Sequence, residues 1–263
     1  MKQFAKYFGN SWGVVLTELM VASVVGLIAL GGAVAVFTGQ QDRLQNENDG
    51  TKVRAKGRHA IKILAREIRM AGYGLPPGGA MTDITVDNSI SFRTNRSADG
   101  TEAKTMVTSN IVAGGSTINV DDGLNFKDGD KIVIYQTGGF DPQKNCTLDG
   151  DGSTNSISVT CPGEALKAFD FGFLANLITI NKYNDWVIAL VGEEIQKTID
   201  GTTTVLIDDI SPTADGLQFN YFGIDEAVTS KIQISLSLVD PKNPDASIQF
   251  NTDVALRNLG IQG

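Results

Sequence analysis

The sequence contains little of the chemistry on which most enzyme and metal sites depend. Among 263 residues it has one histidine, His59, and two cysteines, Cys146 and Cys161. Zinc sites draw on clusters of Cys and His, but the sequence has no Cys-x-x-Cys pair and no spaced His/Asp set. It also lacks a Ser/His/Asp set and a glycine-rich phosphate loop after a strand. We therefore expect no enzyme activity and no cofactor.

Positive charge is also scarce. The chain has 22 Lys and Arg against 30 Asp and Glu, a net charge of −8. Nucleic-acid binding requires clustered basic residues that displace counterions. The basic residues between Lys52 and Arg69 alternate with apolar ones, which is typical of a solvated helix face, and His59 among them is interpreted as a surface or sheet-facing residue. We expect no nucleic-acid partner.

Charge is nearly absent from one stretch. From Val14 to Phe37 the chain is apolar, with Glu18 as its one charged residue. The stretch is long enough to cross a bilayer and longer than the apolar region of a cleaved secretory signal, about 7–15 residues. Because Lys2 and Lys6 precede it, we expect the short end to face the cytoplasm and the rest to be exported. A carboxylate inside a membrane span costs about 2.5–3.5 kcal/mol on insertion scales and usually has a function.

The segment Gly13-Val-Val-Leu-Thr-Glu-Leu-Met-Val-Ala resembles the signature of type IV prepilins. The resemblance implies that a prepilin peptidase removes residues 1–13 and that Val14 becomes the N-methylated N-terminus. Glu18 would then dock against the free amine of an adjacent subunit, and breaking one side of such a buried pair costs about 3–5 kcal/mol. The family usually has Phe in place of Val14 and an apolar residue in place of Thr17. An ordinary signal anchor is the alternative.

Small residues repeat along this stretch at helical spacing, and they allow helices to pack closely in lipid. We expect them to form the helix-packing face: Ala22, Gly26, Ala29 and Ala33.

Helix-forming sequence continues to about residue 72, where Gly72, Gly74 and Pro76-Pro77 end it. We expect residues 14–37 to form a transmembrane helix and residues 38–72 an amphipathic continuation, with a bend or frayed turn near Asp49. The segment Leu64-Ala-Arg-Glu-Ile-Arg-Met-Ala-Gly-Tyr73 resembles PilW-type minor pilins. The residues expected to pack on a sheet are Ile61, Leu64, Ile68 and Ala71.

From about Ile84 the pattern changes to short alternating segments separated by turn residues, which indicates antiparallel strands. We expect strands around residues 84–95 and 177–258 to form the sheet on which the helix packs. Residues of about 105–170 are expected to form an inserted small β subdomain. The expected fold class is α+β, a type IV pilin fold in which residues 73–263 form a β-rich globular head.

The two cysteines would form a disulfide in an exported head, because export leads to an oxidising compartment. Two free thiols are the alternative. A bond closing a loop of about 15 residues contributes about 3 kcal/mol in the chain-entropy model. Within the loop, Asp149 and Asp151 alternate with glycine as in calcium loops, but the position that needs Glu in an EF-hand is Thr160. A plain turn is the main interpretation, and calcium binding is the alternative.

The resemblance implies a PilW-type minor pilin, an assembly subunit that helps prime a type IV pilus and lies at or near its tip. The implied partners are the prepilin peptidase, other major and minor pilins and the inner-membrane assembly platform. Before assembly the chain would span the inner membrane once, with its head in the periplasm; afterwards it would belong to the pilus at the cell surface. Two alternatives stay open: a J-type minor pseudopilin of a type II secretion system, and a tip adhesin or binding module, with or without calcium.

Overall fold

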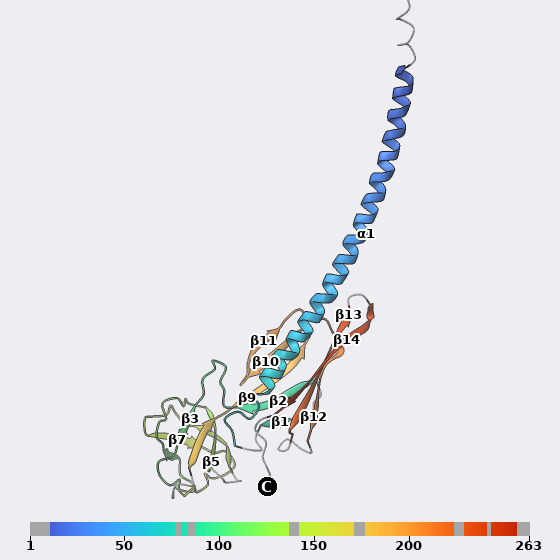
Figure 1. The fold of residues 1–263 in the computed structure, drawn as a ribbon. Coiled ribbons are helices and arrows are strands. Elements are labelled where there is room, and N and C mark those ends of the chain that lie inside the picture. The colour runs from blue at the N-terminus through green and yellow to red at the C-terminus, as the bar shows by residue number, and fades with distance from the viewer. Residues whose placement is uncertain are drawn as a thin grey trace, which may run out of the picture. The chain divides into compact units, whose positions relative to one another are not determined.

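The computed structural model describes residues 11–76, 80–83, 88–136, 142–170, 177–223, 229–240 and 243–256. A long helix, α1, and antiparallel sheets built from strands β1 to β14 confirm an α+β architecture (Figure 1). The chain divides into two compact units, residues 1–52 and 53–263, and each is described by itself.

Helix α1, drawn in blue in Figure 1, extends from Ser11 to Ile68. The frayed turn expected near Asp49 is absent, and Asn48, Asp49 and Gly50 are all helical. On the helix surface here, Lys52 pairs with Asp49 at 3.1 Å, and the Thr51 hydroxyl donates to the Glu47 carbonyl. Propensity is a weak preference that context overrides, so the prediction of a frayed turn was wrong.

The last turns of α1 bury one face, as the spacing of their apolar residues predicts. Leu64 and Ile68 are fully buried, and Ile61 and Ala71 are 9% and 1% exposed. The helix ends at Ile68 and the chain turns over residues 69–74. Gly72 has a φ of 72°, a left-handed conformation that glycine adopts without steric cost.

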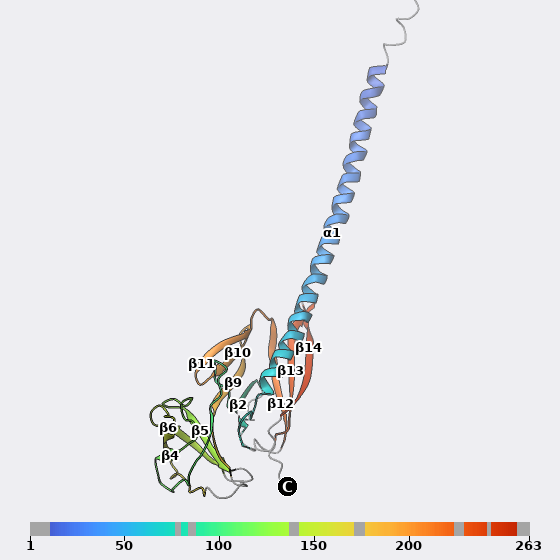
Figure 2. The ribbon, with the colours of Figure 1, turned by 60° about the vertical axis from the view of Figure 1, so that its left-hand side comes forward.

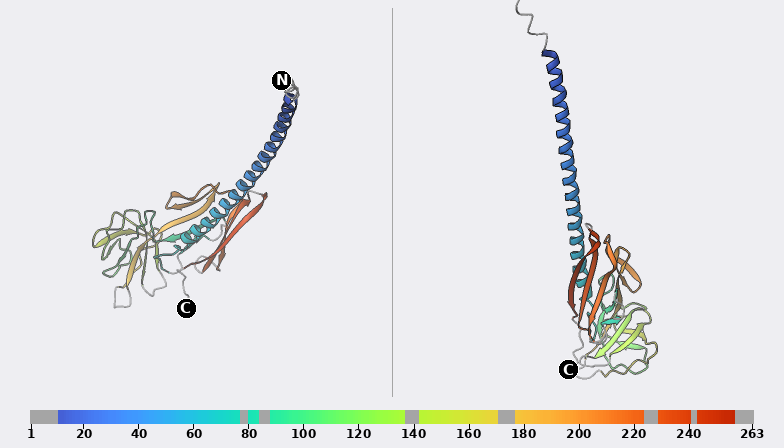
Figure 3. Two further views of the ribbon diagram at one scale, coloured as in Figure 1. Left: turned by 45° about the horizontal axis from the view of Figure 1, so that its top comes forward. Right: turned by 90° about the vertical axis from the view of Figure 1, so that its right-hand side faces the viewer.

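Two sheets pack against this face of the helix (Figures 1 and 3). Buried side chains from α1 and from both sheets form one hydrophobic core, centred on residues such as Leu64, Phe92, Ile188, Phe219 and Ile234. The first sheet, which we call the main sheet, has the order β1-β2-β9-β10-β11. The second sheet has the order β12-β13-β14. Their strands are β1 (Met81–Asp83), β2 (Ser89–Thr94), β9 (Asn184–Val191), β10 (Glu194–Ile199), β11 (Thr202–Ile207), β12 (Pro212–Phe222), β13 (Lys231–Asp240) and β14 (Asn243–Ala255).

A glycine brings β14 close to the helix. A Cβ atom added at Gly57 would lie 2.3 Å from the Phe250 ring, far inside van der Waals contact. The Phe250 ring therefore occupies the space that any larger residue at position 57 would fill.

A third sheet has a core of its own and the strand order β3-β8-β5-β6-β7-β4 (Figure 2). A bridge between Val107 and Val120 joins its two ends, where Thr108 N–H donates to Asn119 O at 3.0 Å. The hydrogen bonds thus close the six strands into a ring, which we call the inserted barrel. Its strands are β3 (Lys104–Met106), β4 (Thr117–Asn119), β5 (Lys131–Gln136), β6 (Gln143–Leu148), β7 (Ser156–Thr160) and β8 (Ile178–Lys182).

The inserted barrel includes one strand that was expected in the sheet on which the helix packs. Strand β8 pairs with β3 and β5, so the insertion extends to Lys182 rather than to about residue 170. The chain returns to the main sheet at β9, whose partners are β2 and β10. Strand membership depends on partners distant in sequence, which alternation alone does not reveal. The strand expected at residues 84–86 lies outside the described residues.

Candidate assembly site

The first part of α1 exposes its apolar side chains. Leu16, Leu19 and Met20 are 63%, 70% and 62% exposed, and the same holds along the helix to Phe37, at 60%. One segment of this helix is long and apolar enough to cross a membrane, by length and composition alone. Such a surface is unfavourable in water, so this part of the helix requires lipid, a signal-sequence receptor or other helices around it.

Glu18 is exposed on the same face of α1 as the small residues. Ala22, Gly26, Ala29 and Ala33 follow it at steps of four, four, three and four, which places all five within about 80° around the helix axis. A Cβ atom at Gly26 would meet nothing within 4 Å. A single helix face therefore combines a carboxylate with a surface that a second helix can approach closely.

The expected cleavage site lies at the edge of the described residues. Gly13 and Val14 belong to α1, but residues 1–10 and the side chains of residues 11–15 lie outside the described part of the chain. Cleavage after Gly13 stays a prediction.

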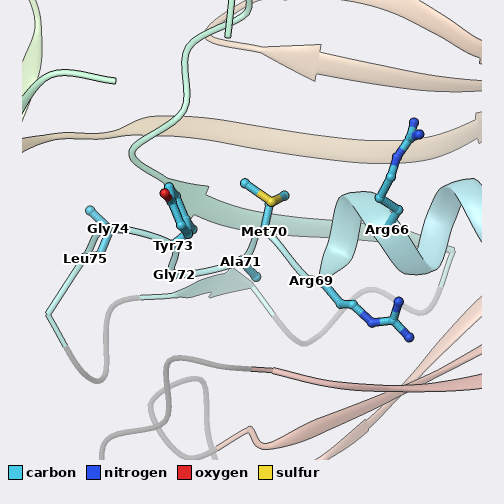
Figure 4. Close-up of a pocket in the computed structure, with 8 residues that line it drawn as sticks. All are labelled: Arg66, Arg69, Met70, Ala71, Gly72, Tyr73, Gly74 and Leu75. Atoms are coloured by element: carbon cyan, nitrogen blue, oxygen red, sulfur yellow. The ribbon is translucent and has the colours of Figure 1, made fainter. Parts of the chain in front are cut away.

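The end of α1 lines a cavity of about 400 Å³, formed by the last helical turn and the following loop (Figure 4). Figure 4 shows Met70 beside Tyr73, while Arg66 and Arg69 point in different directions. Tyr73 is 46% exposed, and its hydroxyl donates to Glu102 at 3.4 Å. The segment that resembles PilW-type pilins thus ends on a partly open surface.

An adjoining cavity of about 440 Å³ shares Arg66 and Met70 and has Trp186 and Lys197 in its lining. The Lys197 ammonium lies 4.4 Å from the centre of the Trp186 ring and 3.1 Å from the Glu67 carboxylate. The side chains of Lys197 and Glu67 are 17% and 11% exposed. Lys197 thus fixes the buried Glu67 carboxylate against the main sheet.

The loop after α1 is bound by both the main sheet and the inserted barrel. Gly72 N–H donates to Arg93 O at 2.7 Å, and Asn95 N–H donates to Tyr73 O at 2.8 Å. From the barrel, the Asn181 amide donates to the Gly74 carbonyl. Leu75 packs with Val133, Tyr135 and Tyr183 in a small separate core. Residues 72–75 therefore join helix, sheet and barrel.

Four charged residues form a second link between barrel and sheet, which we call the junction network. Asp185 accepts from Arg93 at 3.0 Å and from Lys131 at 2.6 Å, and Lys131 also reaches Asp200 at 2.9 Å. Burial alone would raise the pKa of Asp185, but the hydrogen bonds from Lys131 and Arg93 outweigh it and hold this pKa below its usual value. Burial would lower the pKa of Lys131, but its bonds to Asp185 and Asp200 raise it. The sequence gives no signal for this network, because no local pattern connects residues 93, 131, 185 and 200.

The cysteines form the expected disulfide, Cys146–Cys161, which joins β6 to the end of β7 inside the barrel. Nearby, Asp151 accepts from Asp128 N–H at 3.0 Å and from Lys127 at 3.3 Å. The Asp128 N–H and, after it, Lys127 lower the pKa of the Asp151 carboxyl. Within the described residues, no group of three or more His, Cys, Asp or Glu side chains is placed to hold a metal ion. Asp151 thus links the turn at residues 127–130 to the bend at residues 149–150, in which Asp149 lies.

Comparisons of the chain with protein-family models, with curated proteins and with solved structures give no match. The functional argument therefore depends on the residues and on their arrangement.

Proposed function

We propose that this chain is a minor pilin of the PilW type, a type IV pilus subunit that helps to prime filament assembly. The observation that carries the proposal is the helix face that combines Glu18 with Ala22, Gly26, Ala29 and Ala33 on an apolar, exposed surface directly after Gly13. A carboxylate there has no use in a monomer dissolved in lipid, but it pairs with the free amine that cleavage exposes on a neighbouring subunit.

The second half of α1 supports the same proposal. It is buried against its own sheets by Ile61, Leu64 and Ile68, whereas the first part exposes its apolar residues. A subunit built in this way waits in the inner membrane with its head in the periplasm. On assembly, its helix moves from lipid into a bundle of other pilin helices, and the head joins the filament, near its tip.

The inserted barrel favours a further role for this chain, the display of a binding module at the pilus tip. It has its own closed hydrogen-bond ring, core and disulfide, and the α1 core does not include its residues. Such a module is not needed to pack the helix. A binding function at the pilus tip therefore fits alongside the structural function, and a calcium-dependent form of it predicts a higher melting temperature of the full chain at millimolar calcium.

Two experiments test the proposal. Mass spectrometry of the protein extracted from membranes of cells with active prepilin peptidase should find a mature chain that begins at a methylated Val14. A chain that still begins at Met1 would refute processing and leave an ordinary signal anchor. Deletion of the gene should abolish surface pili and leave secretion intact. Loss of secretion with normal pili would instead identify a J-type pseudopilin, which has the same leader and helix.

A further inference from the structure

A row of four basic side chains follows the exposed side of the second half of α1. Arg54, Arg58, Lys62 and Arg66 are four residues apart from one to the next, and all are exposed. Residues at this spacing are neighbours on the helix surface, and the row extends for about 18 Å. We call these four residues the basic ridge.

The carboxylates of the chain leave most of this charge unpaired. In the described parts of the chain, Arg54, Arg58 and Lys62 make no ion pair. Arg66 lies 3.1 Å from Glu67, but Lys197 holds the same carboxylate at 3.1 Å.

The two other lysines of the described helix are paired, and the first of them, Lys52, lies 3.1 Å from Asp49. Lys56 turns to another side of α1 and pairs with Asp209 at 2.5 Å. The basic ridge stays unpaired although the chain carries a net charge of −8. Like charges at i, i+4 destabilise an isolated helix only slightly.

The geometry of the ridge suits a second helix. Rows at i±4n are the ridges that fit between the rows of a packed helix in the commonest class of helix crossing. Beside the ridge, the next row begins with Thr51 and Ala55, which are short and exposed. The row continues with His59, which is also exposed, and with the partly buried Ile63.

We propose that the basic ridge docks an acidic helix of a neighbouring subunit, with Asp or Glu at positions i, i+4 and i+8. This inference rests on the proposed function and gives the chemistry of the partner. A helix matches the ridge in length and carries only a few negative charges. A nucleic acid is a dense polyanion that the acidic remainder of this chain repels.

Peptide binding to the full chain in neutral detergent tests the proposal directly. The probe is a synthetic helical peptide with four Glu at i, i+4, i+8 and i+12. One control peptide has Gln in place of Glu, and another has the same Glu residues scattered around the helix. In fluorescence anisotropy at low salt, the probe should bind at least tenfold more tightly than either control. The preference should weaken as salt rises, because exposed charges are screened.

Variants of the chain separate charge from fold. The triple variant R54Q/R58Q/K62Q should lose the tenfold preference while its melting temperature stays equal or rises, since repulsion is relieved. The charge-preserving variant R54K/R58K/K62R should keep the preference. Equal binding of the scattered peptide, a preference that survives the Gln variant, or tighter binding of a 20-base-pair DNA duplex than of the probe would overturn the proposal.

Assembly in cells distinguishes failure of this inference from failure of the proposed function. The R54Q/R58Q/K62Q chain should be cut after Gly13 like the wild type but be lost from filaments. If the wild-type chain is not cut, the proposed function fails whatever the peptide result. If the variant is cut and incorporated normally, the basic ridge has no docking role and the inference alone fails.

Discussion

Asp185 is the centre of the junction network, and its replacement by Asn is the sharpest test of how the inserted barrel is held. The substitution keeps the shape of the side chain but removes the charge that Arg93 and Lys131 contact at 3.0 and 2.6 Å. Lys131 keeps its second partner, Asp200, at 2.9 Å. The expected result is a less stable link between barrel and sheet in a chain that still folds.

The size of the expected loss of stability follows from the exposure of the paired side chains. The Asp185 side chain is 37% exposed, and those of Arg93 and Lys131 are 29% and 39% exposed, so solvent screens both pairs. Exposed pairs contribute about 0.2–1 kcal/mol each, and a network of short contacts lies toward the upper end of this range. We expect Asp185→Asn to lower the free energy of unfolding by about 1–2 kcal/mol. For a unit of this size that corresponds to a melting temperature about 2–8 °C lower.

The pH dependence adds a second check. The folded pKa of Asp185 is lowered, so its contribution is fully present above the unfolded pKa of about 3.9 and is lost as the pH falls through the folded value. The folded pKa of Lys131 is raised, so its contribution is present below its unfolded pKa of about 10.4 and is lost as the pH rises through the folded value. The difference between wild type and variant should therefore be largest between roughly pH 5 and pH 10.

Fluorescence of Trp186, which is 3% exposed and follows Asp185 in the chain, reports the melting of full-length protein in detergent. Asp253→Asn is the matched control, because Asp253 makes a single exposed pair with Lys231 at 2.6 Å and should cost less than 1 kcal/mol. A loss for Asp185→Asn no larger than that of the control at pH 7, or one that persists at pH 2, would refute the reasoning.

Three further predictions follow from the packing and from the proposed assembly. Gly57→Ala should destabilise the full chain by about 1–2 kcal/mol in urea unfolding, because overpacking against Phe250 outweighs the gain in helix propensity. In a Phe250→Ala background the same substitution should stabilise the chain. A loss of stability in both backgrounds contradicts the packing argument. Replacing Cys146 and Cys161 together by Ala should lower the free energy of unfolding by about 3 kcal/mol, and a loss below 1 kcal/mol would show that the disulfide is not important for stability. Glu18→Ala should leave cleavage after Gly13 intact, as mass spectrometry would show. It should reduce incorporation into filaments at least about a hundredfold, since one side of a buried pair is removed. Normal incorporation in immunoblots of sheared pili would speak against a docking role for Glu18.

The helix and its buried face were predictable because their signals are local. Apolar spacing from Ile61 to Ala71 predicts the buried face without knowledge of the partner sheet, and the glycine at position 72 marks the turn that follows. The one local error, at Asn48–Gly50, arose because three residues with turn propensity lie inside a helix that continues on both sides. The helix on both sides of them outweighs their intrinsic preference.

Sheet membership was less predictable, since it depends on distant partners. Strand β8 reads as a strand in any sheet, and only its pairing with β3 and β5 places it in the inserted barrel. Strand β6 has no clear alternating pattern, because its sequence, Gln-Lys-Asn-Cys-Thr-Leu, is mostly polar. Its buried residues Cys146 and Leu148 become recognisable as a pattern only once the disulfide partner is known.

The contacts of residues 72–75 show how a force on the subunit would reach the inserted barrel. Within residues 53–263, the last turns of α1 are buried in the main core, and the loop that follows is hydrogen-bonded to β2 through Arg93 and to β8 through Asn181. The junction network links the same two bodies through Asp185 and Lys131. Arg93 takes part in both links, because its carbonyl accepts from Gly72 N–H and its guanidinium donates to Asp185. If the chain is a filament subunit, as proposed, force on its helix would reach the barrel through these shared contacts.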